Sequence, residues 1–137
     1  MIVNNENISF TSHKSTSSSD DLDILNKVTH GVKNCIKICH VNTQSLPSNF
    51  IEFVRLFSNS VFDVIVISES WLKKHHSSKT YSLFSYKLYR NDRYDKRGAG
   101  VAVYIKQPLK PKILKSSPNA YDVNQSEYMY ISIATKK

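Results

Sequence analysis

Two polar residues with the chemistry of metal ligands follow two predicted strands of the sequence. Asn42 comes directly after the alternating segment 35–41, and Glu69 follows the nearly continuous apolar segment 62–68. If the two strands are parallel neighbours, their ends lie roughly 5 Å apart, at the edge where such sheets bind ligands. A carboxamide and a carboxylate there suit Mg²⁺, which takes one or two protein carboxylates and fills its shell with water and phosphate.

A purely structural interpretation competes with this one. Asparagine often satisfies the backbone of a turn, and a surface glutamate is commonly a solvated charge. On spacing alone the structural interpretation is favoured. A metal-binding role for Asn42 and Glu69 therefore needs support from other residues of the sequence.

The elements that must position the two residues form a strand, a helix and a strand. Segment 35–41 alternates with period two, which predicts a strand. A helix then opens at Pro47 with Ser48 as its cap and ends at Asn59. Its apolar face repeats at helical spacing: Phe50, Phe53, Val54 and Phe57. Segment 62–68 is rich in β-branched residues, which predicts a central strand, and the crossover allows parallel, right-handed pairing.

The rest of the sequence predicts three further strands in a mixed sheet of about five. Strands 86–90 and 100–105 flank a polar turn that ends in Gly98. Segment 108–118 contains three prolines and is expected to be irregular. The last strand spans 127–134, with alternate apolar residues on one face: Met129, Ile131 and Ile133.

With only one helix to cover the sheet, we expect one apolar face to stay exposed. Val64 and Val66 lie on that expected face, as does one side of the last strand. Exposed apolar patches of this kind favour aggregation or partner binding.

Composition predicts one basic domain behind a polar arm. The chain has 137 residues and a net charge of +8, which suits a polyanionic partner, although solubility alone could explain the charge. Residues 1–33 are serine-rich and poor in apolar pattern, so we expect a disordered arm before a domain at 34–137. No apolar run reaches the roughly 18–20 residues of a membrane span.

The two cysteines indicate a reducing compartment. Cys35 and Cys39 lie four apart in one predicted strand, so roughly 13 Å separates them and they cannot form a disulfide with each other. We expect both to be buried thiols, as in an intracellular protein.

Four ordered segments carry a resemblance to a known family. They read ICHVNTQSL at 38–46, FDVIVISESWL at 62–72, YKLYRNDR at 86–93 and KRGAGVAVYI at 96–105. Together they resemble the amino-terminal half of the endonuclease/exonuclease/phosphatase superfamily, and within it the apurinic/apyrimidinic-like endonuclease domain of jockey-type non-LTR retrotransposons. The resemblance implies a partial two-sheet α/β sandwich, α+β in content, with a mixed sheet.

The resemblance also implies roles for particular residues. Asn42 matches the asparagine that helps to bind metal and phosphate, and Glu69 matches the acidic metal ligand, so these two are the implied catalytic residues and Mg²⁺ or Mn²⁺ the implied cofactor. Gln44 falls where many relatives carry Asn or Asp near the metal, and is an implied phosphate-binding residue. Gly98 and Gly100 match a turn that needs a permissive backbone.

Other matched residues have two interpretations. Arg90 and Arg93 match an arginine-rich strand end that implies phosphate contact, while a hairpin ion-pair cluster with Asp92 is nearly as well supported. Trp71 and Leu72 match a bulky pair that we interpret as packing.

The second half of the family's catalytic set is missing from this sequence. That half supplies a tyrosine, an Asp-x-Asn pair and an Asp-His pair, and no such segment follows Glu127. We therefore expect a C-terminally truncated fragment of a magnesium-dependent DNA-nicking endonuclease, linked to a reverse transcriptase and inactive alone. Whether the chain is itself an enzyme stays open.

Two alternatives remain beside the endonuclease fragment: another phosphoesterase of the superfamily, or a basic, non-catalytic polypeptide that binds nucleic acid. The expected partners are DNA and either the missing half or a reverse transcriptase domain. The expected location is intracellular and nuclear. The side chains expected to contact DNA are basic: Lys73, Lys74, Arg90, Arg93, Lys96 and Arg97.

Overall fold

A parallel strand pair bridged by one helix forms the part of the fold that carries Asn42 and Glu69. The computed structural model describes residues 23–24, 27, 34–59, 61–94, 97–118 and 126–134. Strand β1 (Ile38–Asn42) pairs in parallel with β2 (Val64–Ser68), and α2 (Leu46–Phe57) connects them. The expected strand–helix–strand unit is confirmed, whereas the predicted arm at 1–33 falls almost wholly outside the described residues.

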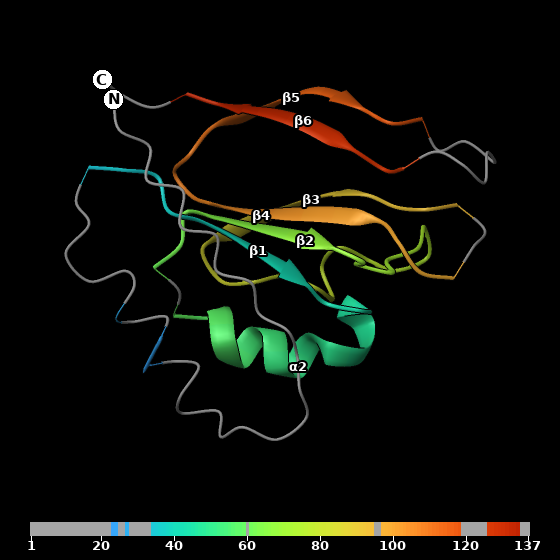
Figure 1. Cartoon of the computed structure of the whole chain (residues 1–137), viewed down its shortest axis with the longest axis horizontal. Coiled ribbons are helices and arrows are strands. Elements are labelled where there is room, and N and C mark those ends of the chain that lie inside the picture. The colour runs from blue at the N-terminus through green and yellow to red at the C-terminus, as the bar shows by residue number, and fades with distance from the viewer. Residues whose placement is uncertain are drawn as a thin grey trace.

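Helix α2 covers one face of the sheet with the predicted apolar side (Figure 1). Phe53 and Phe57 are buried, and Phe50 and Val54 pack against the same cluster. The predicted cap was wrong by three residues: Ser45 is the N-cap, and its side chain accepts a hydrogen bond from the Ser48 backbone N–H at 3.3 Å. An N-cap hydroxyl of this kind satisfies one of the free N–H groups of the first turn.

The main sheet is mixed and has four strands in the order β1-β2-β4-β3. Strands β3 (Tyr86–Asn91) and β4 (Val101–Lys106) pair antiparallel with each other, and β4 also pairs antiparallel with β2. The content is therefore α+β, with one mixed sheet.

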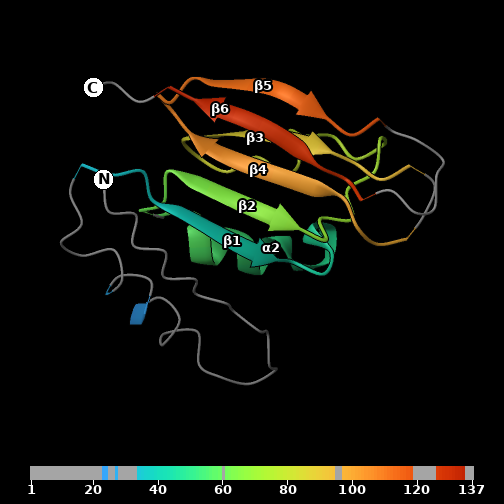
Figure 2. The same cartoon turned by 45° about the horizontal axis from the view of Figure 1, so that its top comes forward.

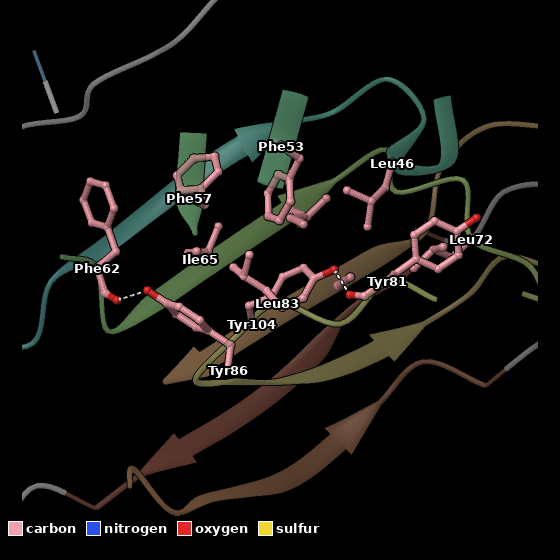
Figure 3. Packing of buried hydrophobic residues seen from close by; sticks show 12 residues of the cluster. Leu46, Phe53, Phe57, Phe62, Ile65, Leu72, Tyr81, Leu83, Tyr86 and Tyr104 are labelled. Atoms are coloured by element: carbon pink, nitrogen blue, oxygen red, sulfur yellow. Dashed lines mark hydrogen bonds between the residues drawn. The ribbon is translucent and has the colours of Figure 1, made fainter. Parts of the chain in front are cut away.

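Two hydroxyl-to-carbonyl bonds tie the loops to the core under α2, as Figure 3 shows. The buried Tyr104 hydroxyl donates to the Tyr81 carbonyl at 2.5 Å. The Tyr86 hydroxyl donates to the Phe62 carbonyl at 2.6 Å. Each bond satisfies polar atoms that burial would otherwise leave unpaired.

A separate two-stranded sheet covers the other face, as the two views in Figures 1 and 2 show. It consists of β5 (Pro111–Ser116) and β6 (Met129–Ile133), paired antiparallel. The expectation of an irregular segment at 108–118 is therefore wrong. Pro111 is the first residue of β5, a position at which a strand tolerates proline.

The expectation of an uncovered sheet face is also corrected. Met129, Ile131 and Ile133 pack on a second buried cluster that includes Val64, which is only 4% exposed. The strands thus form a four-stranded sheet and a two-stranded sheet. The β5–β6 sheet is the second layer, and residues of β6 pack against the first. At the β1 edge Ile38 remains 61% exposed.

The two thiols differ from each other. Cys39 is partly buried, whereas Cys35 is exposed, so the expectation of two buried thiols is wrong for Cys35. Both are free, in agreement with the spacing argument. Within the part of the chain that the structure describes, no helix is long and apolar enough to cross a membrane.

Candidate metal and phosphate site

Three loops meet where β1 and β2 end and β4 begins. The first loop is bonded to the second, since the Ser45 and Leu46 N–H groups donate to the Glu69 and Ser70 carbonyls at 3.0 and 2.9 Å. The second is bonded to the third, since the Ser70 N–H donates to the Gly100 carbonyl at 3.1 Å. The loops 42–46, 68–71 and 97–100 therefore form one hydrogen-bonded unit.

Unusual backbone angles are concentrated in these loops. Non-glycine residues with positive φ cost of order 1–3 kcal/mol each and cluster at functional sites. Five such residues lie in the three loops: Gln44 (44°), Ser45 (101°), Glu69 (53°), Trp71 (53°) and Ala99 (56°). The interloop hydrogen bonds hold these backbone conformations in place, as is typical of functional sites.

Glu69 is held in place by two hydrogen bonds to one of its oxygens. Oε2 accepts from the Trp71 indole Nε1 at 2.9 Å and from the Ala99 N–H at 2.8 Å. These bonds, the Trp71 bond above all, lower the pKa of Glu69 below its ordinary value, and the charge of Arg93 adds to the effect. The carboxylate is therefore ionised at neutral pH. Among the described residues, no donor contacts Oε1.

Asn42 is the residue of β1 that lies in register with Ser68, next to Glu69 in the chain. Its Oδ1 accepts a hydrogen bond from the Gln44 N–H at 3.1 Å, which is the turn-satisfying arrangement of the structural interpretation. Asn42 and Gln44 are both exposed. The structure thus brings these two residues and Glu69 to one edge of the sheet, as the parallel-pair argument required.

The two arginines are engaged elsewhere. The Arg90 guanidinium donates to the Asp92 carboxylate and to the backbone carbonyls of Lys73 and His76. Of the two interpretations given for Arg90, this contact is the ion pair with Asp92. Arg93 forms an ion pair with Glu127 at 3.0 Å. Phosphate contact by either residue stays a prediction.

Trp71 has a role that the sequence did not reveal. Leu72 is fully buried, as the packing interpretation required. Trp71 instead donates to Glu69, and the Arg97 guanidinium lies over its ring at 5.5 Å from the centroid. An indole two residues after a carboxylate was the available signal, but only the left-handed backbone of the loop lets the two side chains meet.

The glycine turn needs glycine for two different reasons. Gly98 and Gly100 both have φ of +85°, the left-handed region expected for them. At Gly100 an added Cβ would also lie 2.7 Å from Ser70 Oγ, a side chain that is fully buried. The turn can therefore approach β2 closely enough for Ala99 to donate to Glu69.

The residues present fit part of a magnesium site. Glu69 offers an ionised carboxylate with one oxygen engaged, and engaged partners of this kind orient metal ligands. Asn42 can add a neutral oxygen. No group of three or more His, Cys, Asp or Glu side chains that could hold a metal occurs among the described residues. Water and phosphate would have to complete the shell, as is usual for Mg²⁺.

Comparison with known proteins adds no independent assignment: no family model and no curated protein matches the chain.

Proposed function

We propose that this chain is the amino-terminal half of a magnesium-dependent phosphodiesterase of the endonuclease/exonuclease/phosphatase type, in the branch that nicks DNA for non-LTR retrotransposition. The observation that carries the proposal is the position and state of Glu69. It lies directly after a strand parallel to β1, beside Asn42, as an ionised carboxylate whose Oε2 is fixed by Trp71 and Ala99.

Each residue then has a defined task. Glu69 would hold the cation, and the hydrogen bonds to Oε2 keep its carboxylate in one orientation. Asn42 would contribute an oxygen without adding negative charge. A bound Mg²⁺ supplies charge stabilisation for the phosphate and the leaving oxygen.

The proposed substrate is DNA, because the loops of this edge carry positive charge. Lys73 follows the Glu69 loop in the chain, the Arg97 guanidinium lies over the Trp71 ring in that loop, and the whole chain has a net charge of +8. Lys96, also expected to contact DNA, lies outside the described residues. We propose a nuclear location and a partner that supplies the tyrosine, Asp-x-Asn and Asp-His groups.

A second candidate is a basic, non-catalytic polypeptide that binds nucleic acid. The contacts at the site favour it in one respect: Asn42 Oδ1 and Glu69 Oε2 already have partners within the chain. On this view Glu69 only holds the three loops together. Another phosphoesterase of the superfamily is the third candidate, and it shares the metal site.

Magnesium titration by calorimetry separates the first candidate from the second. We expect weak binding to the wild type and none to Glu69→Gln, because the substitution removes the carboxylate charge that the proposed site offers to the cation. Glu52→Gln is the matched control, since Glu52 lies on the exposed side of α2 in an ion pair with Arg55. If Glu69→Gln binds Mg²⁺ as well as the wild type does, the metal site is wrong.

A plasmid-nicking assay tests whether the reaction needs the catalytic groups that this sequence does not contain. We expect the 137-residue chain to show no nicking above background, because general acid–base catalysis contributes typically about 10²–10⁴-fold and the Asp-His pair is absent. Nicking that Glu69→Gln removes would contradict this expectation, and would show that these residues suffice for the reaction.

A further inference from the structure

The outer face of the β5–β6 sheet differs chemically from its inner face. Figure 1 shows the pair as the outer layer on the side of the main sheet opposite α2. Met129, Ile131 and Ile133 pack inward. Because side chains alternate along a strand, the residues between them face outward, and Tyr130 is 59% exposed.

Two tyrosines form an aromatic surface on this outer face. The rings of Tyr128 and Tyr130 have centroids 5.2 Å apart and are tilted by 32°. They are two residues apart in the chain and so lie on the same side of it. The pair leaves aromatic surface exposed to solvent, whereas other tyrosines of the chain, such as Tyr104, are buried in the core.

Two lysines share the face with the tyrosines. Lys115 is the cross-strand partner of Tyr130, and Lys112 that of Ser132, so both point outward with them. Both lysines are exposed. Neither strand contains an acidic residue, and no ion pair of either lysine occurs in the described part of the chain.

We propose that this tyrosine–lysine face, made by Lys112, Lys115, Tyr128 and Tyr130, binds single-stranded nucleic acid. Bases stack on the tyrosines, and the lysines contact the phosphates. Non-specific single-strand sites combine these same two elements, a positive track and aromatic rings. A duplex is excluded as the preferred partner because its base faces are stacked inside the helix. The proposal does not depend on the metal site at Glu69.

Fluorescence anisotropy with a labelled oligo-dT tests the stacking. A length of about 16 nucleotides is suitable, because it is the upper site size of a single-strand-binding OB-fold domain. We expect Tyr130→Ala to weaken binding by about fivefold or more. Tyr130→Phe keeps the ring and should bind as the wild type does. Phe84→Ala is the matched control, because Phe84 is 85% exposed and precedes β3, outside this face.

The salt dependence tests the lysines separately. For single strands, log K falls with log salt at a slope of about −0.7 per phosphate contact. The double variant Lys112→Ala/Lys115→Ala should therefore flatten the slope by about 1.4. Both slopes are measured in EDTA, without Mg²⁺, which keeps this result independent of the metal site.

Three outcomes would overturn the proposal. One is equal affinity of Tyr130→Ala and the wild type. Another is equal affinity for the single strand and for a duplex of the same length, which would indicate general electrostatic attraction. The third is self-association through this face, seen as a Tyr130-dependent dimer in sedimentation without oligonucleotide.

Discussion

Replacing Trp71 by phenylalanine removes one donor from Glu69 while keeping an aromatic ring. The lost bond joins Nε1 to Oε2 over 2.9 Å. Hydrogen bonds to charged groups contribute about 1.5–3 kcal/mol, but water can reach this partly exposed carboxylate, and solvent screening reduces the value. We expect a loss of about 1 kcal/mol in the free energy of unfolding at neutral pH.

The pH dependence identifies the hydrogen bond as the cause. The bond lowers the pKa of Glu69 in the folded protein, so its contribution is present above the unfolded pKa and is lost as the pH falls through the folded pKa. Urea unfolding of Trp71→Phe and the wild type should therefore differ at neutral pH and converge in acid. A gap that stays constant with pH would show that ring packing, not the bond, is responsible.

Metal affinity provides the functional readout of the same variant. Loss of a partner that orients a metal ligand typically costs 10–100-fold in affinity, and exposure places Trp71→Phe near the lower value. In a Glu69→Gln background the substitution should have little further effect, because the ligand is already gone. Equal Mn²⁺ affinity of Trp71→Phe and the wild type by calorimetry would refute the positioning role.

Three further substitutions or reagents test other contacts. Gly100→Ala should destabilise the protein by about 2–5 kcal/mol in urea unfolding, because it combines a left-handed alanine with a 2.7 Å contact to Ser70 Oγ; a loss below about 1 kcal/mol would contradict the close approach. Tyr104→Phe should cost about 1–3 kcal/mol, since it leaves a buried carbonyl without its donor, and an unchanged midpoint would argue against that bond. At pH 8 a colorimetric thiol reagent should modify Cys35 and leave Cys39 unreacted, because burial raises the pKa of Cys39 to about 12; rapid reaction of both thiols would disprove it.

The strand–helix–strand unit could be predicted because its signals are local. Period-two alternation in β1, the helical spacing of Phe50, Phe53 and Phe57, and the β-branched run of β2 each follow from residues near one another. The parallel pairing then followed from the connection, and with it the meeting of Asn42 and Glu69 at one edge.

Strand β5 could not be predicted because its residues carry little strand signal. Five of its six residues are exposed, and three prolines occur at 108, 111 and 118. Its partner β6 begins only at Met129, so the pairing is not a local signal in the sequence. The same omission produced the wrong expectation for Val64, since a chain without β5 and β6 in a second layer has nothing to cover that residue.

The indole contact of Trp71 and the backbone-carbonyl contacts of Arg90 could not be predicted from the sequence for another reason, although the Arg90–Asp92 ion pair was one of the two interpretations. Both depend on backbone geometry that brings distant groups together: positive φ at Glu69 and Trp71, and the carbonyls of Lys73 and His76 turned toward Arg90. Residue type indicated packing for Trp71, and contact with phosphate or with the Asp92 carboxylate for Arg90. Only the fold decides which partners lie in reach.

The bonds between the three loops have a consequence for hydrogen exchange. Loops at strand ends usually open first and exchange their amides fastest. Here the amides of Ser45, Leu46, Ser70 and Trp71 donate to carbonyls of a neighbouring loop. They should exchange only when the ends of β1, β2 and β4 separate together, so the loops that carry Asn42 and Glu69 are expected to share the protection of the sheet itself.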